Sequence, residues 1–155
     1  MVCSCRVAPE ARFYFNRAHP FQTVSGFVYA VRAGQWDFAY NSLSRATRED
    51  LSATKFYLAV QLISDPTTGV PIYDTIVEAQ RDRSQLMPGR DAGHCSIFLY
   101  HSGTTPPSGD ADAAVATEIR ELELDLTLEP DETSGRPEWK IDLARTVSRL
   151  GARLE

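Results

Sequence analysis

The most constraining feature of this sequence is the segment RELELDLTLE at residues 120–129. Its leucines occupy every second position, and the residues between them are charged or polar. Because successive side chains of a β-strand point to opposite faces, this alternation predicts a strand with one buried and one solvated face. Asp125 lies between two leucines of this segment, so we expect it to be a solvated carboxylate.

Two further segments show the same period of two. EWKIDLA at 138–144 predicts another strand with Asp142 facing outward, and the loop PDETSGRP before it predicts an antiparallel hairpin. Its inward residues are Trp139, Ile141 and Leu143. HCSIFLYH at 94–101 also alternates, and we expect Cys95 to be a small buried apolar residue there.

The first half of the chain has a helical period instead. A first helix begins at Pro20, which suits a first helical turn, and stops at Gly34. Its inward residues recur every three or four positions: Phe21, Val24, Phe27, Val28 and Val31. A second short helix begins near Gln35, and a third runs through 56–63. The segment 70–79 fits either a short helix or a strand.

Between the second and third helices, LSRATREDLS at 43–52 is rich in residues that cap helices. Ser44, Thr47 and Ser52 are candidate N-caps, and Asp50 three residues after Thr47 resembles a capping box. We therefore expect a hinge made of short turns.

Helices followed by antiparallel strands predict a single α+β domain. Three segments of that domain, PFQTVSGFVYAVRAG, GQWDFAYNSLS and EWKIDL, together resemble the nuclear transport factor 2-like superfamily, which includes ketosteroid isomerase and scytalone dehydratase. The resemblance covers about residues 20–148 and leaves 149–155 as a tail. It implies a cone-shaped α+β barrel, in which N-terminal helices pack in the concave face of a curved, mostly antiparallel sheet. The chain resembles in particular bacterial members, often exported or lipid-anchored, that have no assigned activity.

The beginning, MVCSC, resembles the end of a bacterial lipoprotein signal with Cys5 as the lipidated residue. However, no positively charged start and no apolar stretch of about 7 to 15 residues precede it. Two explanations stay open. Either the true start lies upstream, so that residues 1–19 are a signal remnant or tether of an envelope lipoprotein, or the cysteines are incidental and the protein is cytoplasmic. The run FYF at 13–15 is unusually aromatic for a tether and also fits packing on the fold.

The composition excludes several classes of partner. A net charge of −5 argues against binding to nucleic acid, which needs a positive surface. No apolar run reaches the roughly 18 residues of a membrane span. The three cysteines, Cys3, Cys5 and Cys95, form no zinc motif, and we expect neither a metal nor another cofactor.

No set of residues in the sequence predicts catalysis. His94 and His101 are seven residues apart on one strand and so face opposite sides, and the sequence names no group that would orient either ring. The resemblance implies a pocket at the open end of the cone. Four aromatic residues of the helical layer are candidates to line it, although they also fit core packing: Tyr29, Trp36, Tyr40 and Tyr57.

These observations favour a non-catalytic domain that binds a small apolar molecule or a protein partner. The alternative is a small acid–base enzyme, an isomerase, dehydratase or hydrolase, acting on an apolar substrate in the cone pocket. A third hypothesis is a structural homodimer that pairs the sheet faces of two copies.

Overall fold

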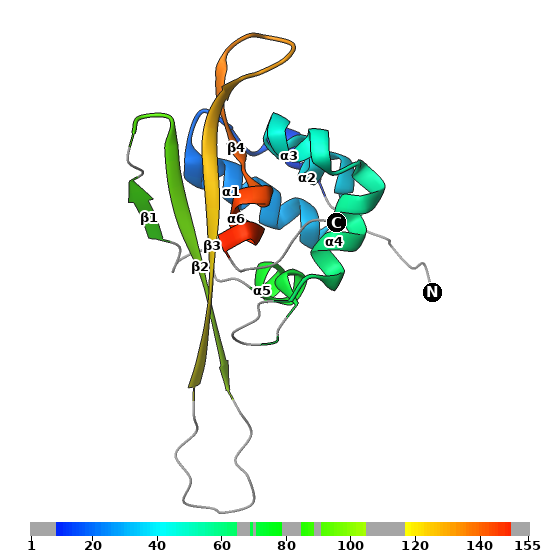
Figure 1. Ribbon diagram of the computed structural model, residues 1–155, viewed down its shortest axis with the longest axis vertical. Coiled ribbons are helices and arrows are strands. Elements are labelled where there is room, and N and C mark those ends of the chain that lie inside the picture. Colours follow the sequence, from blue (N-terminus) through cyan, green and yellow to red (C-terminus); the bar gives the residue numbers. More distant parts are fainter. Residues whose placement is uncertain are drawn as a thin grey trace, which may run out of the picture.

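The computed structural model describes residues 9–64, 69, 71–78, 85–88, 91–104 and 117–149. Helices occupy the first half of these residues, and the strands follow in the second half (Figure 1). The chain therefore has an α+β fold, as the change of period predicts. The cone shape implied by the resemblance stays a prediction.

Four antiparallel strands form one sheet in the order β1, β2, β3, β4 (Figure 1). They are β1 (Gln85–Pro88), β2 (His94–Thr104), β3 (Thr117–Pro130) and β4 (Pro137–Ile141). The register places Leu126 of β3 between Cys95 of β2 and Ile141 of β4. All three side chains are buried, which confirms the burial of Cys95 and the inward direction of Leu126 and Ile141. Leu128, predicted on the same inward face, is 38% exposed.

The predicted hairpin joins β3 and β4. The backbone N–H of Asp131 donates to Arg136 O at 2.8 Å, and Gly135 has a φ of +67°, which an L-residue with a side chain rarely adopts. The Asp131 carboxylate accepts hydrogen bonds from the N–H groups of Thr133 and Ser134 at 3.2 and 2.9 Å. The hairpin turn is thus held from within by one aspartate.

The helices of the first half lie on one side of the sheet (Figure 1). After a short 3-10 turn, η1 (Ala11–Phe13), come α1 (Pro20–Arg32), α2 (Trp36–Asn41), α3 (Arg45–Asp50), α4 (Ala53–Leu62) and α5 (Ile72–Glu78). The predicted stripe of α1 is buried except for Phe21, which is 41% exposed. Thr23 and Ala30 extend the buried face on the opposite side, and this leaves Phe21 at its rim.

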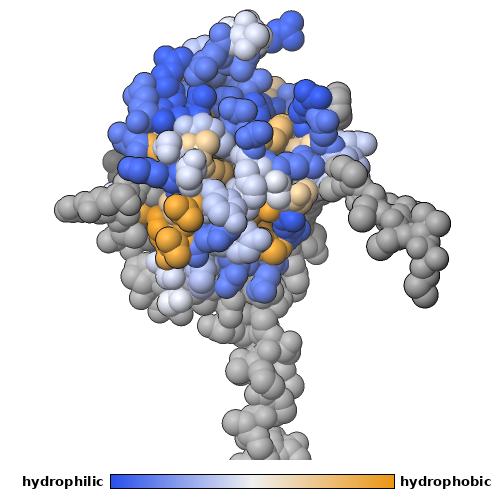
Figure 2. All heavy atoms as spheres, turned by 90° about the vertical axis from the view of Figure 1, so that its right-hand side faces the viewer, coloured by the Kyte–Doolittle hydropathy of each residue, from blue (hydrophilic) through white to orange (hydrophobic). Residues whose placement is uncertain are grey.

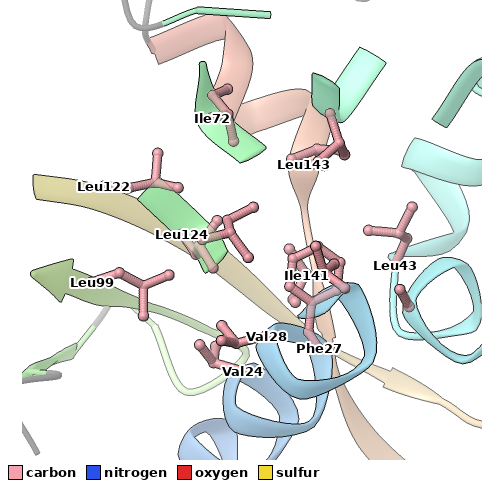
Figure 3. Close-up of a cluster of buried hydrophobic side chains, with 14 of the residues drawn as sticks. Val24, Phe27, Val28, Leu43, Ile72, Leu99, Leu122, Leu124, Ile141 and Leu143 are labelled. Atoms are coloured by element: carbon pink, nitrogen blue, oxygen red, sulfur yellow. The ribbon is translucent and has the colours of Figure 1, made fainter. Parts of the chain in front are cut away.

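The core lies between α1 and the leucine face of the sheet (Figure 3). Figure 3 shows side chains of both layers meeting there: Val24, Phe27 and Val28 from α1, and Leu99, Leu122, Leu124 and Ile141 from the strands. Phe27, Leu124 and Ile141 have no exposed surface. Each such side chain stabilises the fold by roughly 1.5–3 kcal/mol through burial. Side chains therefore fill this part of the space between helices and sheet.

The segment 43–52 forms a helix where a hinge of turns was predicted. α3 begins after Ser44, whose Oγ accepts the backbone N–H of Thr47 at 3.2 Å. Ser52 caps α4 in the same way. Thr47 is not an N-cap and forms no capping box with Asp50, because it lies inside α3 with its side chain fully buried. Two of the three candidate caps are thus confirmed and the third is wrong.

Within the segment 70–79, for which helix and strand were both open, the residues Ile72–Glu78 form the helix α5. Its residues Ile72 and Ile76 are buried at a spacing of four, and α5 contacts both β2 and β3. The helical alternative is confirmed.

The last strand is shorter than predicted, because β4 ends at Ile141 and a helix, α6 (Leu143–Arg149), follows. Asp142 is intermediate in exposure, and its carboxylate accepts the backbone N–H of Arg145 at 3.0 Å, a hydrogen bond typical of an N-cap. Leu143 is buried as predicted, but it reaches the core from α6. The alternation of apolar and polar residues continues for one pair beyond the end of the strand.

α6 covers the edge of β3 that β4 leaves free, and this corrects the prediction for Asp125. The Asp125 N–H donates to Thr146 Oγ1 at 3.0 Å, and the Asp125 carboxylate pairs with Arg149. Asp125 is therefore 8% exposed and not solvated. Burial of a carboxylate requires such partners, and the helix that supplies them was not predicted.

Candidate functional site

Two of the four predicted pocket aromatics have their hydroxyl groups bonded within the fold. Tyr29 Oη donates to Pro9 O at 2.7 Å, and its ring packs against Phe15. Tyr40 Oη donates to Leu51 O at 2.9 Å. Both residues join separate segments of the chain, which is the packing role that the sequence left open for them.

The other two, Trp36 and Tyr57, lie together. Their ring centroids are 4.8 Å apart with an interplanar angle of 87°, an edge-to-face arrangement that aromatic rings favour. Tyr57 is 40% exposed on α4, and Trp36 is partly exposed at the start of α2. Of the four candidates, Trp36 also lines a groove on the surface of the protein.

One wall of that groove is the segment before α1. Ala11 is 1% exposed, and its N–H donates to Gln35 Oε1 at 2.9 Å. Further along, the N–H of Trp139 in β4 donates to Arg17 O at 2.8 Å. Residues 9–19 were predicted as part of a tether ending before Pro20, but the described part of that segment packs on the domain. Cys5 and the rest of residues 1–8 lie outside the described residues.

The groove has two adjoining compartments, which share Arg12, Phe38 and Asn41 as lining residues. The aromatic compartment, about 740 Å³, is lined by Gly34, Gln35, Trp36 and Asp37 together with residues 10–12. The charged compartment, about 520 Å³, lies against the β3–β4 hairpin. Its ionisable residues are Arg12, Arg17, Arg48, Lys140, Glu129, Asp131, Glu132 and Glu138.

Glu138 holds two cations of the charged compartment. Lys140 Nζ lies 3.1 Å from Glu138 Oε2 and also donates to Asn41 O at 3.2 Å. Arg17 Nη1 lies 3.7 Å from the same carboxylate oxygen. Burial lowers the pKa of Arg17, and Glu138 opposes this shift by stabilising the charged form. Phe38 contributes as well, because its ring lies beneath the Arg17 guanidinium at 4.6 Å.

Arg48 is the third cation and is held differently. Its Nη2 donates to Glu132 Oε1 at 2.6 Å, and Glu132 is an exposed residue of the hairpin. The Arg48 Nε is buried and has no hydrogen-bond partner in the described structure. Because nearly all buried polar atoms in native proteins are hydrogen-bonded, an unsatisfied one calls for an explanation.

The remaining acidic residues of the compartment already accept hydrogen bonds from the backbone. Glu129 accepts the N–H of Arg45 at 3.0 Å. Asp131 accepts the turn N–H groups described above, and the bonds from Ser134 are the main cause of its lowered pKa. Glu129 thus joins the hairpin to the start of α3, and Asp131 holds the hairpin turn itself.

A histidine–aspartate pair lies at the start of β2, away from the groove. His94 Nδ1 is 2.7 Å from Asp91 Oδ1, and this hydrogen bond is the main cause of the lowered pKa of Asp91. Asp91 was not predicted as an orienting group, although it lies only three residues before His94. Both side chains are exposed, His94 by 43% and Asp91 by 63%.

Burial raises the pKa of neighbouring Cys95 to about 11, so its thiol is protonated at neutral pH.

Within the described residues, no group of three or more acidic, histidine or cysteine side chains is arranged to hold a metal ion. In the same part of the chain, no helix is both long enough and apolar enough to cross a membrane. No protein-family model matches this chain, and no curated protein matches it either.

Proposed function

We propose that this protein is a non-catalytic binding domain of the nuclear transport factor 2-like type, and that the groove beside α2 is its ligand site. The type rests on the order of helices and antiparallel strands and on the three segments quoted above. The site rests on the groove and on the filled core between α1 and the sheet, which leaves the surface groove as the better place for a ligand.

One observation carries this proposal: an aromatic compartment adjoins a charged one. Small-molecule sites are mostly apolar concavities with a few polar groups that fix orientation. Trp36 and Phe38 supply the apolar wall, and Arg48 and Lys140 supply polar groups a short way along it. Lys140 is anchored by Glu138 and by the backbone carbonyl of Asn41, so this polar group is in place before any ligand arrives.

Nuclear magnetic resonance with decan-1-ol as a neutral probe tests this proposal. We expect saturable changes in amide shifts around Trp36 and residues 10–12, and we expect Phe38→Ala to weaken them because it removes the ring shared by both compartments. Phe21→Ala is the matched control, since Phe21 is an exposed phenylalanine that does not line the groove. A ligand site in the groove would be contradicted if decan-1-ol caused no saturable shifts. It would also be contradicted if the shifts were the same in Phe38→Ala as in wild type.

A small acid–base enzyme is the second candidate, and the His94–Asp91 pair favours it. A carboxylate that accepts from one ring nitrogen orients the imidazole and supports its role as a base. Hydrolysis of 4-nitrophenyl acetate by wild type and His94→Gln separates the two proposals. If the protein is a non-catalytic binding domain, we expect wild type and His94→Gln to hydrolyse the ester at equal rates. A clear loss of the hydrolysis rate in His94→Gln would favour the enzyme.

A second surface feature favours a protein as partner. α4 carries Leu58 and Leu62 with 48% and 76% of their surface exposed. On the side of the molecule that carries the helices, Figure 2 shows small apolar groups set among mostly hydrophilic residues. Leu58→Ser and Leu62→Ser would leave binding of decan-1-ol unchanged if the groove is the ligand site.

A further inference from the structure

Glu132 pairs with only one of the two N–H donors on one edge of the Arg48 guanidinium. By the naming convention of arginine atoms, the Nε–H and one N–H of Nη2 point from the same edge of the planar group. Planar carboxylates bind this edge with both oxygens, one for each N–H. Glu132 supplies one oxygen to Nη2 at 2.6 Å, while Nε has no partner in the described structure. The Nε–H is therefore an unsatisfied buried donor on the same edge that Glu132 uses.

Among the three cations beside the hairpin, Arg17, Arg48 and Lys140, Arg48 has the carboxylate partner that is easiest to replace. Lys140 and Arg17 share Glu138, which is 25% exposed, and Lys140 has a backbone carbonyl as well. Glu132, in contrast, is 57% exposed. Exposed ion pairs contribute little to stability, so exchanging Glu132 for another carboxylate costs little.

The position of Arg48 fits a ligand with one acidic end. The charged compartment that Arg48 lines shares Phe38 with the aromatic compartment that Trp36 lines. A second negative charge would face Glu129 and Asp131, which line the same compartment. Charge complementarity is thus best for a single carboxylate on an apolar body.

We propose that the groove binds a small monocarboxylic acid with an apolar chain or ring system. Its carboxylate takes Nε and Nη2 of Arg48 in place of Glu132, and its apolar part lies against Phe38 and Trp36. Glu132 acts as an internal competitor that occupies the site when no ligand is bound. This inference rests on the proposed function, since it names the ligand class of the same groove.

Isothermal titration calorimetry with three ten-carbon probes tests it: decanoate, decan-1-ol and the dicarboxylate sebacate, each below its aggregation concentration. We expect wild type to prefer decanoate to sebacate. We expect Glu132→Gln to bind decanoate about tenfold more tightly than wild type, because the competing charge is gone, and to bind decan-1-ol unchanged. Glu49→Gln is the control, because it removes an exposed acidic charge from α3 outside the groove.

Arg48→Lys keeps the positive charge but removes the two-pronged edge, so we expect it to lose about tenfold in affinity for decanoate. Circular dichroism confirms that each variant is folded, and the exposed Glu132 variant decides the question if Arg48→Lys is not. Equal decanoate affinity in wild type, Glu132→Gln and Glu49→Gln would overturn the inference. If decan-1-ol still binds and Phe38→Ala weakens its binding, the proposed ligand site is retained and only the ligand class is wrong. If neither decanoate nor decan-1-ol binds, the ligand site and the ligand class are both wrong.

Discussion

Replacing Gly26 with alanine tests whether the segment before α1 belongs to the folded domain. Gly26 is buried in α1, and a Cβ built on it would lie 2.9 Å from Phe15 Cβ and 3.0 Å from Phe15 Cγ. Real Cβ atoms are almost never that close to another heavy atom. Because Phe15 Cβ is bonded to the backbone, rotation of the ring alone does not relieve the contact.

The two physical effects of Gly26→Ala have opposite signs. Alanine is favoured over glycine inside a helix by about 1 kcal/mol, so the change would stabilise α1 if nothing packed against it. Overpacking a well-filled site costs about 1–3 kcal/mol. The Phe15 ring also packs on Tyr29 at a centroid distance of 5.6 Å, and moving it weakens this contact. We expect a net loss of about 0.5–2 kcal/mol in the free energy of unfolding.

Urea unfolding of the full chain measures this difference. Phe15→Gly removes the Cβ that causes the clash, so in that background Gly26→Ala should stabilise the protein by about 1 kcal/mol. If Gly26→Ala stabilises the wild-type background by the same amount, Phe15 does not pack on α1. The residues before Pro20 would then be a tether, as predicted, and the domain would begin at Pro20.

Three further outcomes follow from individual contacts. Thr146→Val removes the hydroxyl that accepts the N–H of Asp125, so we expect a loss of about 1–2 kcal/mol in urea unfolding, against almost none for the exposed control Thr133→Val. The pKa of Asp131 is lowered in the folded state, so its stabilising effect is present above the unfolded pKa and is lost as the pH falls through the folded value; the difference in urea midpoint between wild type and Asp131→Asn should shrink below about pH 4. Cys95 should react with iodoacetamide at pH 7 only after unfolding, because burial shields its sulfur and raises the pKa of its thiol to about 11; mass spectrometry of tryptic peptides would show early labelling if this is wrong.

The sequence predicted the class of fold well because the strands and helices differ sharply in period. It failed at α6, where Asp142 and Leu143 continue the alternation of β4 for one more pair although the backbone has already turned. The misplacement of Asp125 has the same origin. Alternation indicates which side of the sheet a residue faces, but not whether a later helix covers that side or its edge.

The groove was not predictable in the same way. Arg17, Arg48 and Lys140 come from three distant parts of the chain, and each looks like an ordinary surface cation in the sequence. The one local signal is the spacing of two between Glu138 and Lys140, which puts both on the same face of β4 and allows their ion pair. Trp36 was a candidate because it is aromatic, whereas Phe38 on the same short helix was overlooked.

The packing of the N-terminal segment and the proposed function depend on the same contacts. Residues 10–12 line the aromatic compartment, and Phe15 and Arg17 line the charged one, so the groove loses a wall if this segment detaches. Gly26 does not line the groove, yet its alanine variant displaces Phe15. A ligand that needs this wall should therefore bind Gly26→Ala more weakly and should stabilise wild type more than the variant. Equal stabilisation of both proteins would place the ligand on a surface that the segment does not form.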